Sequence, residues 1–157
     1  MRRTDKQITD KKRINSILDM GLVCRIALSD ANEPYIVSLC YGHSKGYIYF
    51  HSAREGKKID MIRKNPRVCF QIDTGIELIE NENPCRWAMK YQSVVGYGIV
   101  QELDKPDEKR RALETIMSHY RKSEYEFEDT AVEKTSVFSI SIMELSGKIS
   151  PAEKSLV

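Results

Sequence analysis

The sequence lacks long apolar runs, a strong charge of one sign and closely spaced cysteines. No apolar run in its 157 residues approaches the ~20 that a membrane-spanning helix needs. The N-terminal stretch MRRTDKQITDKKR is charged, and no apolar segment follows it, so we expect no secretory signal. The formal net charge of +2 is too small to favour nucleic acid or a membrane surface as a partner. These absences predict a cytoplasmic protein with no nucleic-acid and no membrane partner.

The cysteines also exclude one class of site. Cys24, Cys40, Cys69 and Cys85 are widely spaced, and no CxxC pair is present. A structural zinc site normally contains at least one closely spaced ligand pair, so we expect no metal site. In a reducing compartment, such cysteines are most often small buried hydrophobes, although a redox or catalytic role for any one of them stays open.

What is present indicates an ordinary globular domain. Hydrophobic residues make up 41% of the chain and charged residues 31%, which is typical of a folded protein rather than a disordered one. A length of 157 residues predicts one domain that spans residues 1–157. The tail, residues 148–157, shows no pattern, and we expect it to be mobile.

Apolar alternation with a period of two predicts six strands. They are expected at residues 22–28, 35–41, 47–50, 67–72, 87–103 and 135–145. Turn-forming composition separates the first three strands, and Gly96 and Gly98 mark a bulge or a close backbone approach in the fifth. Because the strands are mostly consecutive, we predict a mostly β fold: an antiparallel six-stranded split β-barrel with flanking helices.

Helical spacing predicts three helices between these strands. The first begins after Asp10 and ends at Gly21. The second begins with Ser52 and Glu55 as a capping box and ends at Asn65-Pro66. The third opens near Pro106 and ends near Tyr120, and an acidic surface loop is expected at residues 123–133.

The start of the second helix is the most informative segment. It reads YFHSAREGKKID, residues 49–60. The first turn of a helix attracts anions, because its backbone N–H groups are unsatisfied and the positive end of the helix dipole lies there. Lys57 and Lys58 add charge at the end of a helix where cations are unfavourable without an anion. The segment therefore predicts a phosphate-binding site, with a solvated basic turn as the alternative.

Three motifs in this order resemble the nitroimidazole-resistance branch of the pyridoxamine-phosphate-oxidase-like, flavin-binding split barrels. They are PYIVSLCYG (34–42), YIYFHSAREGKKIDMIRKNPRVCF (47–70) and CRWAMKYQSVVGYGIVQELDKPDEKRRAL (85–113). The resemblance covers nearly the whole chain. It implies a homodimer with the flavin at the interface, FMN as the cofactor and FAD as the alternative.

The resemblance also implies which residues contact the cofactor. The second strand would face the isoalloxazine ring, the helix start would surround the ribityl phosphate, and a third group would lie near the cofactor from the partner subunit. In that order the residues are Val37, Ser38, Leu39 and Cys40; His51, Ser52, Ala53, Lys57 and Lys58; and Arg86, Trp87, Tyr91 and Ser93.

Two positions depart from the family pattern, and one histidine has several interpretations. Relatives commonly have proline at the position of Ser38 and a polar residue such as asparagine at that of Cys40, so the preferred acceptor is in doubt. His51 matches a histidine held to matter for function in relatives. It could contact the phosphate, transfer a proton as a catalytic residue, or end a strand without either role.

The resemblance implies a flavin-dependent oxidoreductase that reduces a nitroaromatic such as a 5-nitroimidazole, or a similar small organic acceptor, with NAD(P)H as the expected donor. No acid, base or nucleophile constellation in the sequence independently requires catalysis. The alternative is a flavin-binding module that stores or senses the cofactor without turnover.

Overall fold

The computed structural model describes residues 3–151 and contains one antiparallel sheet. The strand order is β3-β2-β6-β7-β8-β5-β4, and β1 pairs with β8 beside this path. The strands are β1 Gln7–Ile8, β2 Cys24–Asp30, β3 Glu33–Leu39, β4 Gly42–Ser44, β5 Tyr47–Ser52, β6 Arg67–Ile79, β7 Ala88–Leu103 and β8 Ser136–Ser150. The expected mostly β fold, an antiparallel split barrel with flanking helices, is confirmed, with eight strands in place of six.

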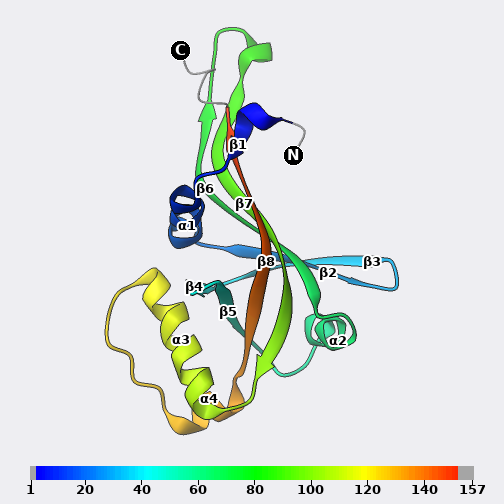
Figure 1. Cartoon of the computed structure of the whole chain (residues 1–157), viewed down its shortest axis with the longest axis vertical. Helices are drawn as coiled ribbons and strands as arrows, with labels where there is room; N and C mark the ends of the chain where they lie inside the picture. Colours follow the sequence, from blue (N-terminus) through cyan, green and yellow to red (C-terminus); the bar gives the residue numbers. More distant parts are fainter. Residues whose placement is uncertain (1–2, 152–157) are drawn as a thin grey trace.

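Four α-helices and two short 3-10 helices flank the sheet in the described part of the chain. The α-helices are α1 Lys11–Met20, α2 Lys57–Lys64, α3 Pro106–Tyr120 and α4 Asp129–Lys134, and the 3-10 helices are η1 Thr4–Lys6 and η2 Pro84–Arg86. Figure 1 shows α2 beside the β2–β3 hairpin, while α3 and α4 lie together at one end of the molecule. None of the helices in residues 3–151 is long and apolar enough to cross a membrane.

The longest strands, β6 and β7, continue beyond the body of the sheet as an arm (Figure 1). In the arm, Leu78 pairs with Met89, and η2 lies in the connection between the strands. The pairing of β7 with β8 extends only as far as Tyr91, opposite Ser150. Beyond Tyr91, the arm is therefore a two-stranded hairpin. Residues 148–150 of the expected tail belong to β8, and residues 152–157 lie outside the described residues.

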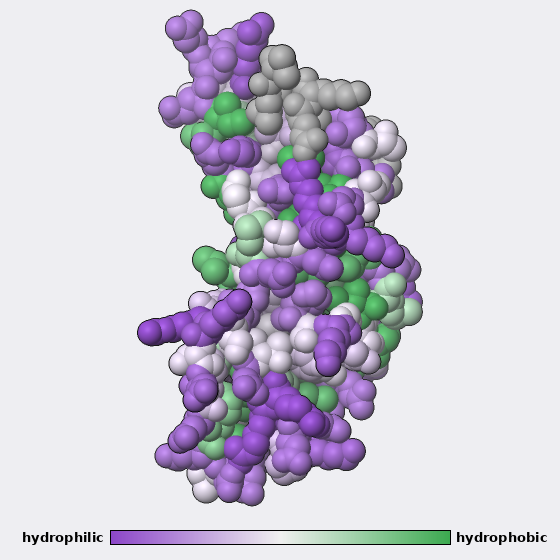
Figure 2. Space-filling view, turned by 60° about the vertical axis from the view of Figure 1, so that its left-hand side comes forward, coloured by the Kyte–Doolittle hydropathy of each residue, from purple (hydrophilic) through white to green (hydrophobic). Residues whose placement is uncertain are grey.

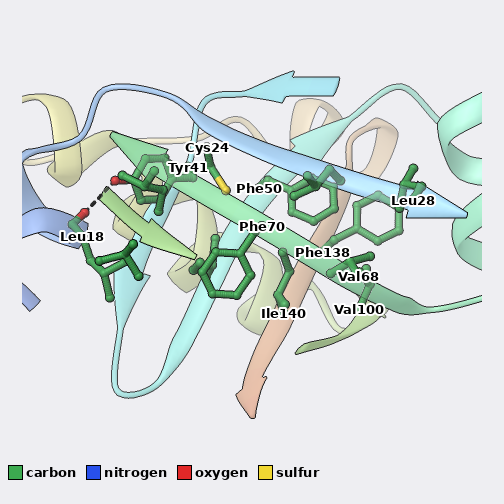
Figure 3. Packing of buried hydrophobic residues seen from close by; sticks show 14 of the residues in the cluster. Leu18, Cys24, Leu28, Tyr41, Phe50, Val68, Phe70, Val100, Phe138 and Ile140 are labelled. Carbon is green, nitrogen blue, oxygen red and sulfur yellow. Dashed lines mark hydrogen bonds between the residues drawn. The ribbon is translucent and has the colours of Figure 1, made fainter. Parts of the chain in front are cut away.

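The core lies between the inner face of the curved sheet and helices α1 and α2. Alternate residues of each strand enter it, as the period of two predicts, and Phe50 stacks on Phe138 with ring centroids 5.0 Å apart. The hydroxyl of Tyr41 is fully buried and donates to the carbonyl of Leu18 at 2.6 Å (Figure 3). Full burial of a large apolar side chain contributes about 1.5–3 kcal/mol, so this cluster is the main source of stability.

Two glycines of β7 allow the strands to approach closely. A Cβ built at Gly96 would lie 2.3 Å from Cζ of Phe70, and one built at Gly98 would lie 2.5 Å from the carbonyl oxygen of Ser141. The register between β7 and β8 shifts between Tyr97 and Gly98. The bulge and the close approach expected here are therefore both present.

Several expected boundaries were wrong. Leu22 is 69% exposed and precedes β2, so it does not belong to the apolar face of that strand. The expected acidic loop contains α4, which buries Val132. Among the four cysteines only Cys24 is buried, where burial raises its pKa to about 12. Cys40 and Cys85 are exposed.

Candidate functional site

The β2–β3 hairpin presents an open backbone edge, because β3 is the last strand of the sheet and pairs with β2 alone. A two-residue turn at Ala31 and Asn32, both with positive φ, connects the strands. In such a hairpin the pair that flanks the turn is hydrogen-bonded, and the hydrogen bonds then alternate along the ladder. By this alternation, the backbone groups of Ile36 and Ser38 point to the open edge.

The ring-facing segment that the resemblance predicts lies at the distal end of this edge. Val37 and Leu39 turn their side chains toward the core and pack against it. Ser38 and Cys40 are exposed. The backbone of Ser38 is therefore available to a ligand at the open edge, while the side chains of Val37 and Leu39 pack behind the strand.

The helix start that the sequence singled out is built differently from the prediction. The expected capping box of Ser52 and Glu55 is wrong, because Ser52 still belongs to β5, where it pairs with Ser136 of β8. The N-cap of α2 is Gly56, with φ 120° and ψ 166° and no side-chain hydrogen bond to the helix. This backbone conformation is accessible almost only to glycine.

The first turn of α2 therefore has unsatisfied donors. The carbonyl of Gly56 accepts from the N–H groups of Ile59 and Asp60, at 2.8 and 3.1 Å. The N–H groups of Lys57 and Lys58 precede these, and no capping side chain occupies them. An anion is the natural partner of two such groups at the positive end of a helix dipole.

The two lysines of this turn have different surroundings. Lys57 forms an ion pair with Glu33 of β3, and its ammonium lies 4.9 Å from the ring centroid of Tyr35. It thereby holds the β2–β3 hairpin against α2. Lys58 is half-buried, burial lowers its pKa below the ordinary 10.5, and the described residues provide it with no ion pair or hydrogen bond. A partly desolvated cation without a counter-charge is unfavourable unless an anion joins it.

The neighbouring residues complete the basic end of the site. His51 and Ala53 are exposed and Ser52 is half-buried, all at the end of β5 that leads into α2. Arg54 points elsewhere, because its guanidinium donates to the carbonyl of Glu133 in α4. Lys57 thus joins the α2 start to the turn end of β3, while the predicted ring-facing segment, Val37 to Cys40, lies toward the opposite end of that strand.

The third predicted group lies apart from the other two in the same chain. Arg86 and Trp87 lie at the end of the arm, away from β3 and α2 (Figure 1). The indole of Trp87 donates to the carbonyl of Asn81 at 2.7 Å, and its ring is 49% exposed. Tyr91 accepts a hydrogen bond of 2.8 Å from Lys148, and Ser93 is buried in the sheet. One chain alone therefore does not assemble all three groups.

Two features of the site were missed by sequence reasoning. Glu33, which pairs with Lys57, lies far from it in the chain, and only the folded hairpin brings them together. Gly56 could have been found, because a glycine directly before two lysines at a helix start is typical of a positive-φ cap beside an anion site. Among residues 3–151 no group of three or more histidine, cysteine or acidic side chains could hold a metal ion.

The site is an open surface rather than a closed pocket. A hollow of about 640 Å³ lies elsewhere, between α3 and β5, with Tyr47, Tyr49 and Arg111 in its lining. Figure 2 shows a largely hydrophilic surface interrupted by apolar patches. The exposed apolar side chains include Ile36, Tyr97 and Ile99 on the sheet and Leu78 and Trp87 on the arm.

Residues 10–149 match the protein family described as pyridoxamine 5'-phosphate oxidase. A candidate 5-nitroimidazole antibiotic resistance protein from Bacteroides thetaiotaomicron is 33% identical, with a TM-score of 0.82 over 91% of this chain and 86% of that one. An FAD-binding protein from Mesorhizobium loti shares the fold at 24% identity, with a TM-score of 0.68 over 92% of this chain and 97% of that one.

A curated relative adds a match without a known function. It is an uncharacterized protein from Rhizobium meliloti, 32% identical over 97 residues, or 62% of this chain. The match spans 57% of that protein's length.

Proposed function

The chain belongs to the pyridoxamine 5'-phosphate oxidase family, and we propose that it binds a flavin nucleotide between the open edge of β3 and the start of α2. The observation that carries this proposal is Lys58, a half-buried cation with no partner in the described residues, beside two uncapped helix N–H groups. These groups fit a phosphate in charge and in hydrogen-bonding capacity.

Different residues of the proposed site would contact the phosphate and the ring of the cofactor. Lys58, the N–H groups of Lys57 and Lys58, and the side chains of Ser52 and His51 would hold the phosphate. The backbone of Ser38 in β3 and of Cys40 directly after β3 would face the ring. FMN is the proposed form, and FAD is the alternative that the named FAD-binding relative makes worth testing.

A bound flavin supplies hydride and electron transfer, while the protein orients it and tunes its potential. The proposed reaction passes electrons from a reduced nicotinamide nucleotide to a small organic acceptor. A nitroaromatic is the first acceptor to test, because the chain is 33% identical to a candidate nitroimidazole resistance protein.

The proposal includes a homodimer. Four strands carry a row of outward-facing residues across the sheet, Ile36, Ala27, Cys69 and Tyr97, and two of these, Ile36 and Tyr97, are large exposed apolar side chains. A two-stranded hairpin is marginally stable by itself, and the arm exposes Leu78, Met89 and Trp87. A second copy would cover both surfaces and could bring its own Arg86, Trp87, Tyr91 and Ser93 to the site.

Titration of the purified protein with FMN and FAD, followed by steady-state assays with NADH or NADPH and a nitroaromatic, tests this function. We expect flavin uptake, flavin reduction by one of the nucleotides and turnover. Tight binding without turnover would favour the storage or sensing module. A monomeric mass by light scattering at micromolar concentration would contradict the shared site.

A further inference from the structure

The end of β3 that lies farthest from Lys57 is surrounded by exposed apolar side chains. Leu22 is 69% exposed, Met117 41% and Tyr120 40%. Val23 and Cys40 adjoin them and are exposed as well. We call these five side chains the Leu22 surface.

Two hydrogen bonds hold this surface together. The hydroxyl of Tyr120 accepts from the N–H of Tyr41 at 2.9 Å and donates to the carbonyl of Leu22 at 3.0 Å. The last turn of α3 is thereby attached to the segment that enters β2 and to the segment that leaves β3. Met117 precedes Tyr120 by three residues and so lies on the same face of α3. The Tyr120 hydroxyl thereby fixes the end of α3 against the backbone on either side of the Leu22 surface.

The Leu22 surface is also free of charge. Residues 20–24 and 39–42 contain no charged side chain, although 31% of the chain is charged. The nearest cations on α3 are Arg121, which caps the end of the helix directly after Tyr120, and Lys122 beyond it. The next cation along β2, Arg25, is paired with Asp73 at 3.1 Å. The opposite end of β3, by contrast, faces Lys57, which pairs with Glu33. The edge strand thus runs from an end that carries an ion pair to an apolar end.

This asymmetry orients the proposed flavin. With its phosphate at Lys58, a bound flavin would extend its ribityl chain and ring along β3, toward Cys40. Tyr35 and Cys40 are five residues apart, which in a strand is roughly 17 Å. A molecule that approaches the exposed side of the ring at this end meets Leu22 and Tyr120.

We infer that the Leu22 surface binds the electron acceptor and selects a flat, uncharged organic molecule over one that carries a phosphate or a carboxylate. The inference rests on the proposed flavin site. Its physical basis is that an anion placed on this surface loses hydration and gains no counter-charge from its five members. Pyridoxamine 5'-phosphate, the compound in the family's name, would accordingly be a poor ligand here.

Two acceptors of the same shape test the inference: 4-nitrobenzamide, which is uncharged, and 4-nitrobenzoate, which is an anion. Flavin uptake is measured first. The Kd of each compound for the oxidised, flavin-loaded protein is then obtained from the change in flavin absorbance. We expect the amide to bind at least about 10-fold more tightly, a difference of about 1.4 kcal/mol.

A charge variant locates the effect. Leu22→Lys places a cation on the surface at a position that is 69% exposed, so it should fold normally and bring the ratio of the two Kd values toward one. Thr130→Lys adds the same charge on α4, beside the beginning of α3 (Figure 1), and should keep the wild-type ratio.

The outcomes separate the two proposals. Equal Kd values of the wild-type protein for 4-nitrobenzoate and 4-nitrobenzamide would overturn the acceptor site. A ratio of the two Kd values that Leu22→Lys leaves unchanged would overturn it as well. Failure to take up FMN or FAD in the first step would instead overturn the proposed flavin function.

Discussion

Replacing Gly56 with alanine tests the anion site through the backbone alone. Gly56 caps α2 with φ 120° and ψ 166°, a region in which an L-residue is strained by about 1–3 kcal/mol. Apart from the two adjacent residues, no part of the described chain lies within 4 Å of a Cβ built there, so the cost does not come from a clash with a distant segment. We expect the free energy of unfolding to fall by ~1–3 kcal/mol.

Relief of that strain should disturb the first turn of α2. The carbonyl of Gly56 accepts from Ile59 at 2.8 Å and from Asp60 at 3.1 Å, so a rotated Gly56 peptide redirects the N–H groups of Lys57 and Lys58. Loss of about 1.4 kcal/mol of phosphate contact raises the flavin Kd about 10-fold. The measurements are a flavin fluorescence titration and urea unfolding of the same samples.

Gly46→Ala is the matched control. Gly46 has φ 82° in the turn between β4 and β5, and again no atom lies within 4 Å of a built Cβ. This variant should lose stability while it keeps the wild-type flavin Kd. If Gly56→Ala loses stability but binds flavin as the wild-type protein does, the phosphate does not bind at the start of α2.

Three further substitutions probe the site and the core. Lys58→Met should weaken flavin binding at neutral pH. Binding needs the protonated amine of Lys58, whose pKa burial lowers below 10.5, so the wild-type protein should lose affinity as pH rises through that pKa and the variant should not. The same pH profile of Kd in both proteins would count against Lys58. Tyr41→Phe leaves the carbonyl of Leu18 without its 2.6 Å donor and should lower the free energy of unfolding by about 1–3 kcal/mol in urea titrations; a neutral result would contradict the role of this bond. Gly98→Ala places a Cβ 2.5 Å from the Ser141 carbonyl oxygen, so we expect a loss of about 1–3 kcal/mol, and an unchanged Tm would show that β7 and β8 can separate at the bulge.

Local patterns predicted elements whose causes are local. Asp10 caps α1 as expected and accepts a hydrogen bond from the N–H of Lys12 at 3.1 Å. The helix also ends at Gly21, but for a different reason than expected. Gly21 has φ −66°, and glycine is required there because a Cβ would lie 2.2 Å from Ile72 and 2.9 Å from the Tyr41 hydroxyl. A contact between distant segments therefore explains what resembles a helix-capping preference.

Elements whose limits depend on distant partners were harder to predict. Ser52 has the spacing of a capping residue, yet its pairing with Ser136 keeps it in β5 and moves the helix start to Lys57. The arm was missed for the same reason, because residues 77–79 become strand only through pairing with residues 88–90 of β7. Ladder hydrogen bonds to a remote strand outweigh a local preference of a few tenths to about 2 kcal/mol.

The candidate site also has one part that local sequence determines and another part that depends on contacts between distant segments. The basic helix start could be predicted from one continuous segment, and the structure confirms α2 there with Lys57 and Lys58 in its first turn. That Lys57 pairs with Glu33 while Lys58 has no partner in the described residues could not be predicted, because it depends on how the β2–β3 hairpin lies against α2.

An absorbance spectrum of the purified protein, with chromatography of any chromophore released on denaturation, tests the central claim most directly. We expect bands near ~370 and ~450 nm from a bound flavin, or their appearance in the protein fraction after incubation with FMN or FAD and removal of the excess. A colourless protein that takes up neither nucleotide would contradict it.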